Sequence, residues 1–148
     1  MPEIIACALR LLARREHGAL ELAEKLRLKG YDKSAINEVI LYCQNLGLQS
    51  DARFIESFCR SRIRQGYGPI KIMQELEHKK VSKDLIMNQL NQENWEAYAL
   101  QAWNKKYKNS HSKIPTEIIK QKRFLLYRGF PMEIINIIFK KNNQEVTL

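Results

Sequence analysis

Three segments of the chain align with one another without gaps, and this internal repeat constrains the fold more than any other feature. The segments are LAEKLRLKGYDKSAINEVI from Leu22, IMQELEHKKVSKDLIMNQL from Ile72 and QKRFLLYRGFPMEIINIIF from Gln121. Their offsets are 50 and then 49 residues. A period of this length is typical of helical repeat proteins, whose units pack mainly on their neighbours.

Each repeat carries the signals of three helices. A helical pattern ends at Gly30, Lys80 or Gly129, an apolar residue follows at once, and a second helical pattern then begins. A further helix precedes each pair, over about residues 4–15, 52–65 and 95–106. The sequence therefore predicts three-helix repeats at 1–48, 49–92 and 93–141, followed by a tail over 142–148 that frays.

The predicted fold class is all-α, with three tandem three-helix repeats in an elongated array. The chain has only 6 Gly and 4 Pro, which are few turn residues for a strand-rich architecture. Asp32 and Ser82 are suitable N-caps. Trp95 and Trp103 lie eight residues apart, roughly on one helical face, and are interpreted as core anchors.

The cysteines and histidines do not indicate a catalytic or metal site. Cys7, Cys43 and Cys59 are odd in number and form no C-x-x-C pair, so we expect reduced thiols in the core. The histidines, which are His17, His78 and His111, are scattered and are expected at the surface or at its boundary. We therefore predict a protein that is not an enzyme and needs no cofactor or metal.

The start of the chain does not resemble a secretory signal, and no apolar run approaches the roughly 18 residues needed to span a bilayer. We therefore expect a cytoplasmic protein with no membrane partner. Its net charge is +9, and +6 of this excess falls within residues 96–148. Such an excess suits an anionic partner, such as nucleic acid or an acidic protein surface.

Arginines recur on one face of the helix predicted over residues 52–65. At 100° per residue, Arg53, Arg60 and Arg64 fall within about 40° of one another, opposite Phe54 and Ile55. Planar guanidinium groups suit phosphates or carboxylates, so these arginines are predicted partner contacts. The alternative is a helix face that is merely solvated.

Arg62 falls within the apolar arc of the same helix, where a charge must be paired or extend to solvent. We predict a structural ion pair with Asp51 or Glu75. Tyr67 lies between two glycines, and with Lys71 it is a further candidate contact. Tyr67 either stacks on a partner as an exposed ring or covers the junction between repeats.

The third repeat carries a second basic cluster. Lys105 and Lys106 precede an exposed loop expected over residues 108–115, and Lys122 and Arg123 follow it. Tyr107 is interleaved with them, as in surfaces that bind nucleic acid through phosphates. The alternative is a surface that only keeps the protein soluble.

Four segments, spread from the first repeat to the last, resemble the RecX family of regulatory proteins. They are ALRLLARREH (Ala8–His17), LRLKGY (Leu26–Tyr31), DARFIESFCRSRIRQGYGPIKIMQEL (Asp51–Leu76) and KQKRFLLYRGF (Lys120–Phe130). The chain departs from the family pattern at Gly18, where a hydroxyl-bearing cap is usual, and at Lys80, where glycine is usual.

The resemblance implies a curved array that binds in the groove of the RecA filament on single-stranded DNA. It implies a monomeric regulator that inhibits the ATPase, strand-exchange and co-protease activities of RecA in DNA repair and the SOS response. Weak, non-specific DNA binding is implied as well. The competing hypothesis is a stand-alone DNA-binding protein that acts by competing with RecA for DNA.

Overall fold

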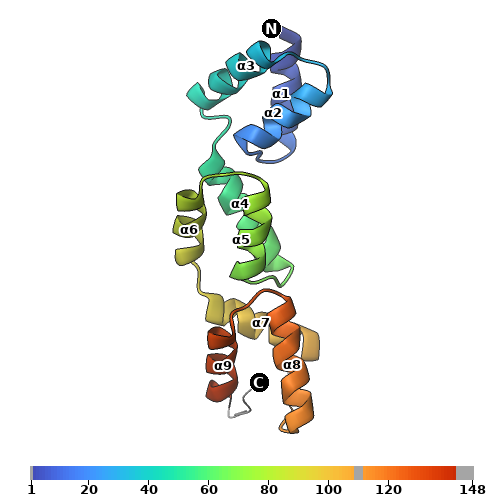
Figure 1. Ribbon diagram of the computed structural model, residues 1–148, viewed down its shortest axis with the longest axis vertical. Helices are drawn as coiled ribbons and strands as arrows, with labels where there is room; N and C mark the ends of the chain where they lie inside the picture. The colour runs from blue at the N-terminus through green and yellow to red at the C-terminus, as the bar shows by residue number, and fades with distance from the viewer. Residues whose placement is uncertain (1, 109–111, 143–148) are drawn as a thin grey trace. The chain divides into compact units, whose positions relative to one another are not determined.

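The computed structural model describes residues 2–108 and 112–142, which fold into nine α-helices and no strands (Figure 1). The all-α prediction is therefore confirmed. The first three helices are α1 (Pro2–Arg14), α2 (Ala19–Leu28) and α3 (Lys33–Asn45). The next three are α4 (Asp51–Arg64), α5 (Pro69–His78) and α6 (Lys83–Asn91). The last three are α7 (Trp95–Tyr107), α8 (Pro115–Tyr127) and α9 (Met132–Lys141).

Local signals set most of the helix ends. Asp32 caps α3 by accepting a hydrogen bond from the Ala35 amide at 2.8 Å, as predicted. Lys80 has a φ of 56°, in the left-handed region where the equivalent Gly30 and Gly129 have a φ of 97°, so it holds this conformation without glycine's freedom. The expected loop contains residues 109–111, and the expected frayed tail contains residues 143–148. Both segments lie outside the described part of the chain.

The first and third repeats each have their own apolar core. One contains Ile4, Leu22 and Val39, and the other contains Trp103, Phe130 and Phe139. All three cysteines are free and buried, as predicted. Leu9 is 38% exposed, because the buried face of α1 runs through Ile4, Cys7 and Ala8.

The chain forms two compact units, and the middle repeat is divided between them. The first unit comprises residues up to Phe58 together with Leu76–Gln89, and the second comprises Cys59–Glu75 together with residues from Leu90 onward. Each unit therefore contains one junction between successive repeats. The repeat boundaries at 48/49 and 92/93 stay a prediction from the sequence.

The junction in the first unit surrounds the turn between α1 and α2. Gly18 provides no side-chain cap for α2, and Asp51 of the next repeat accepts a hydrogen bond from the Ala19 amide at 2.8 Å instead. Gln49 donates to the carbonyl oxygen of His17 at 3.0 Å. A Cβ atom at Gly18 would lie 3.3 Å from the Phe54 ring. The usual hydroxyl cap is thus replaced by a carboxylate from the following repeat.

The junction in the second unit uses the equivalent positions with different chemistry. The Gly68 amide donates to the carbonyl oxygen of Arg128 at 2.7 Å, and the Ile70 amide donates to that of Gly129 at 3.0 Å. The Arg128 guanidinium donates to the carbonyl oxygen of Gln65 at 2.8 Å. The turn between α4 and α5 of the second repeat therefore meets the turn between α8 and α9 of the third repeat backbone to backbone.

His17 is buried at the first junction, although the sequence analysis placed it at the surface or boundary. Its side chain is 1% exposed, Nδ1 bonds the carbonyl oxygen of Arg15 at 3.0 Å, and Nε2 has no partner among the described residues. Burial lowers the pKa of His17, and the nearby charge of Arg15 adds to this effect. Helix periodicity could not reveal this burial, because His17 lies in a turn.

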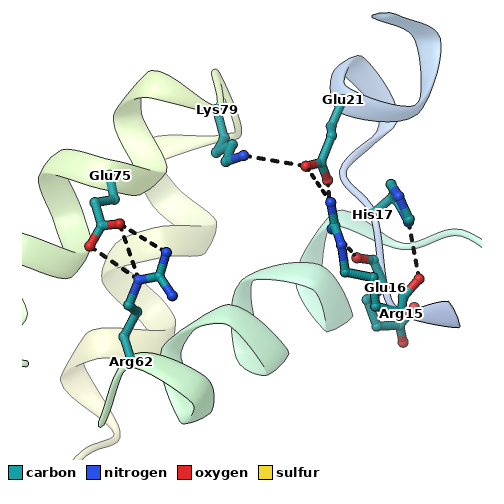
Figure 2. Close-up of polar contacts among 7 residues, drawn as sticks. All are labelled: Arg15, Glu16, His17, Glu21, Arg62, Glu75 and Lys79. Atoms are coloured by element: carbon teal, nitrogen blue, oxygen red, sulfur yellow. Dashed lines mark hydrogen bonds and ion pairs between the residues drawn. The ribbon is translucent and has the colours of Figure 1, made fainter. Parts of the chain in front are cut away.

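Glu21 lies between two cations at the same junction, as Figure 2 shows. Its carboxylate bonds Arg15 at 2.9 Å and Lys79 at 3.3 Å. Burial by itself would raise the pKa of Glu21, but Arg15 and Lys79 outweigh it and lower the pKa to about 2. The carboxylate is therefore charged at neutral pH and links the first repeat to the second.

We predict that the stability of the protein falls as the pH drops below about 6.5, the pKa of an unfolded histidine. The folded pKa of His17 is lowered, so the unfolded chain takes up the proton first, and the slope stays under about 1.4 kcal/mol per pH unit. A second loss follows below about pH 4.5, as Glu21 is protonated. Urea unfolding at several pH values measures both losses. His17→Phe should remove the first slope and retain the second, and an unchanged first slope would contradict the assignment.

Candidate functional site

Basic side chains converge where the C-terminal half of α4 faces α7, within the second unit. Arg60 and Arg64 lie one helical turn apart on α4, and Lys105 lies near the end of α7. Together with Ile63, Gly66, Tyr98, Gln101 and Ala102 they line a groove of about 480 Å³. We call this the α4–α7 groove. Its helices come from successive repeats, so the groove depends on how the second junction is packed.

Tyr98, which lines the α4–α7 groove, is held in place by Glu93 and Trp95. Its hydroxyl donates a hydrogen bond to Glu93 at 2.8 Å, and this bond raises the pKa of Tyr98. The phenol is therefore neutral. Its ring also packs against Trp95, with the centroids 5.7 Å apart.

A second hollow of about 290 Å³ adjoins the groove and shares Gly66, Ala102 and Lys105 with it. It adds Gln65, Lys106, Phe124 and Arg128. Lys106 lies 5.7 Å, and Arg128 5.0 Å, from the centroid of the Phe124 ring. The two hollows together place cations and aromatic rings along α7, an arrangement that can bind phosphates or carboxylates.

Comparison with known proteins shows the family to which the chain belongs. Family models of the first, second and third three-helix domains of RecX match residues 5–43, 50–88 and 94–139. The chain is 50% identical over 143 residues to a regulatory protein RecX of Legionella pneumophila, and the match covers 95% of each chain. The chain belongs to the RecX family.

Other relatives agree with this assignment. A regulatory protein RecX of Pseudomonas putida is 40% identical over 130 residues, which are 86% of this chain and 83% of that protein. The crystal structure of RecX from Lactobacillus salivarius matches with a TM-score of 0.79 at 21% identity, covering 97% of each chain, and this likeness shows the shared fold. RecX proteins are a regulatory family and not a known family of enzymes.

Two further observations bear on the kind of site that this RecX-family chain offers. No group of three or more histidine, cysteine or acidic side chains among residues 2–108 and 112–142 could hold a metal ion. Among the same residues, no helix is both long enough and apolar enough to cross a membrane.

The Arg53 side chain is bonded within the first unit. Its guanidinium bonds Glu16 at 2.9 Å and donates to the carbonyl oxygen of Gly47 at 2.7 Å, although the side chain is 46% exposed. Arg53 therefore contributes to the first junction. The interpretation of Arg53, Arg60 and Arg64 as one set of contacts stays a prediction.

The predicted ion pair of Arg62 is confirmed, and its partner is Glu75 at 3.1 Å (Figure 2). Asp51, the other candidate, caps α2 instead. Tyr67 is half-buried, with Arg128 5.2 Å and Lys71 4.9 Å from its ring centroid. This geometry favours the alternative in which Tyr67 covers the junction between repeats.

Lys122 was predicted as a contact in the basic cluster of the third repeat, and its burial shows that this prediction is wrong. Its side chain is 2% exposed, donates to Asn136 at 2.9 Å and lies 5.4 Å from the centroid of the Phe139 ring. Burial lowers the pKa of Lys122. The residue is thus part of the packing of α8 on α9 and is not an exposed contact. Arg123, the next residue, is exposed on α8 and lines neither hollow.

Replacing Lys122 by methionine should leave the free energy of unfolding within about 1 kcal/mol of the original, or raise it. Methionine has a similar length and requires no buried charge, and Asn136 is accessible enough to bond water. Lys122→Ala is the comparison, because it leaves a void beside Phe139 and should cost about 2 kcal/mol or more. Urea unfolding distinguishes them, and equal losses would show that the charge itself stabilises the fold.

Of the α7 residues that line the groove, only Lys105 was predicted as a contact from the sequence. Tyr98, Gln101, Ala102 and Lys105 follow the i, i+3, i+4, i+7 spacing of one helical face. This spacing was a usable signal. The spacing did not show which side of this helix meets α4 of the preceding repeat, because that depends on how the repeats pack.

Proposed function

We propose that this chain regulates the RecA recombinase by binding the RecA filament on single-stranded DNA through the α4–α7 groove. Binding restrains ATP hydrolysis, strand exchange and co-protease activity. The convergence of Arg60, Arg64 and Lys105 in one groove carries the proposal, because it offers several cations to an anionic polymer or an acidic surface. This role places the chain in the cytoplasm, beside DNA.

Repeated units strengthen such binding. A filament offers the same surface again and again, so one docked repeat raises the effective concentration of the next. Contacts that are weak one at a time can then together hold the chain on the filament. The family assignment supports this proposal, since the relatives are named regulatory proteins.

The test measures ATP hydrolysis by RecA on single-stranded DNA while the chain is titrated in. We expect hydrolysis to fall with increasing chain, and to stay low when more free single-stranded DNA is added. Unchanged hydrolysis over the whole titration would overturn the proposal. Cosedimentation of the chain with filaments provides a second readout that does not depend on turnover.

A stand-alone DNA-binding protein is the second candidate, because Tyr98 and Phe124 lie beside cations that could hold a phosphate backbone. It would inhibit RecA only by competing for DNA. Inhibition that disappears when DNA is in excess, together with tight, salt-sensitive binding to DNA alone, would favour this candidate.

A further inference from the structure

A second basic groove lies in the first unit, remote in sequence from the α4–α7 groove. It has a volume of about 450 Å³ and is lined by Cys7, Arg10, Leu11, Ala13 and Arg14 of α1 and by Lys29, the C-cap of α2. We call this the α1–α2 groove. Its volume is within the range of about 300–1,000 Å³ found for ligand sites.

Among the described residues, the cations of this groove have no acidic partner. Arg10, Arg14 and Lys29 are exposed, and no carboxylate among the described residues forms an ion pair with them. The paired carboxylates of the first unit bind other cations: Glu16 binds Arg53, Glu21 binds Arg15 and Lys79, and Glu24 binds Arg27. The positive charge of the α1–α2 groove is therefore left for an external anion.

The floor of the groove indicates the kind of anion. Cys7 is buried and Leu11 is half-buried, so the cations surround an apolar base. None of the described lining residues is aromatic, so no ring is present on which a base could stack. Arg10 and Arg14 are one turn apart, with about 5–6 Å between such positions, which matches carboxylates four residues apart on a helix.

We propose that the α1–α2 groove binds an acidic amphipathic segment of a partner protein. Its carboxylates pair with Arg10, Arg14 and Lys29, and an apolar side chain covers Leu11. The charge complementarity and the apolar floor select a peptide over nucleic acid. This site does not rest on the function proposed for the α4–α7 groove.

The test uses the full chain and a labelled amphipathic peptide of roughly 15 residues. Its glutamates are four residues apart on one helical face, and its leucines lie beside them. Fluorescence anisotropy should show saturable binding that weakens as salt is added. A matched peptide with glutamine for glutamate should not bind. The variant R10E/R14E should weaken binding by about a hundredfold, or roughly tenfold for each lost charge pair.

Two controls keep the outcome specific. R64E/K105E alters the α4–α7 groove and the hollow beside it but no residue of the α1–α2 groove, so it should bind the peptide as the original chain does. Circular dichroism should show that both variants are folded. The backbone amide resonances of Arg10, Arg14 and Lys29 should shift on peptide addition. Equal loss in both variants, or no shift at these residues, would overturn the proposal.

A single-stranded oligothymidylate of roughly 20 nucleotides is the competing probe. We expect R10E/R14E to change its binding much less than it changes binding of the acidic peptide. If the oligonucleotide loses affinity in R10E/R14E while the acidic peptide does not bind at all, the groove holds phosphates and the proposal is wrong.

Discussion

Replacing Gly68 by alanine is expected to destabilise the protein by about 3 kcal/mol or more, the upper part of the range for overpacking. A Cβ atom at this position would lie 2.6 Å from the carbonyl carbon and oxygen of Gly129 and from the Phe130 nitrogen. These are backbone atoms, so no side chain can rotate away. Relief would require the two turns to separate, which breaks the hydrogen bonds from Gly68 to Arg128 and from Ile70 to Gly129.

Gly47→Ala is the matched control for this substitution. Gly47 has a φ of +73°, yet no atom lies within 4 Å of the position where its Cβ would be. Its replacement therefore costs only the left-handed conformation, about 1 kcal/mol. Thermal and urea unfolding followed by circular dichroism measure both variants. If Gly68→Ala were no more destabilising than Gly47→Ala, the close backbone approach would not be a determinant of stability.

Reversing Arg64 and Lys105 to glutamate should abolish the proposed inhibition of RecA while leaving the fold intact. Both side chains are exposed and both line the α4–α7 groove. The double reversal puts two negative charges where two positive charges met the partner, and we expect affinity for the filament to fall by about a hundredfold or more. The readouts are ATP hydrolysis and cosedimentation with filaments.

K33E/K83E is the control with the same change in net charge. Lys33 and Lys83 are exposed and begin α3 and α6, where a negative charge is favourable for the helix. This variant should inhibit RecA nearly as well as the original chain. Lys122→Met should also retain inhibition, because Lys122 is buried. A similar loss in K33E/K83E would mean that overall charge matters and the groove does not.

Much of the fold followed from periodicity, because helix faces and helix ends are local properties. The helix predicted over about residues 52–65 was found as Asp51–Arg64, and the apolar arc around Arg62 correctly required an ion pair. Spacing could not choose between Asp51 and Glu75, since that choice depends on how α5 packs against α4. The contact between Arg62 and Glu75 is known only from the structure.

The candidate site was less predictable for the same reason. Lys122 follows Gln121 in a basic stretch, and only the packing of α9, which brings Asn136 to it, shows that it is buried. A helical wheel places Arg53 on one face with Arg60 and Arg64, and only the packing of the first repeat shows that the Arg53 guanidinium bonds Glu16. A wheel describes one helix, whereas these assignments depend on the neighbouring repeat.

The carboxylate that caps α2 has a consequence for how such repeats can be exchanged. Asp51 and Gln49 belong to the second repeat in sequence, yet they complete the turn at His17 and Ala19 in the first. If the first repeat were transplanted without them, the Ala19 amide at the start of α2 would lose its hydrogen-bond acceptor. Designers who shuffle these modules should therefore keep residues 49–51 with the first repeat and give the following module its own Ser50, which accepts a hydrogen bond from the Arg53 amide at the start of α4.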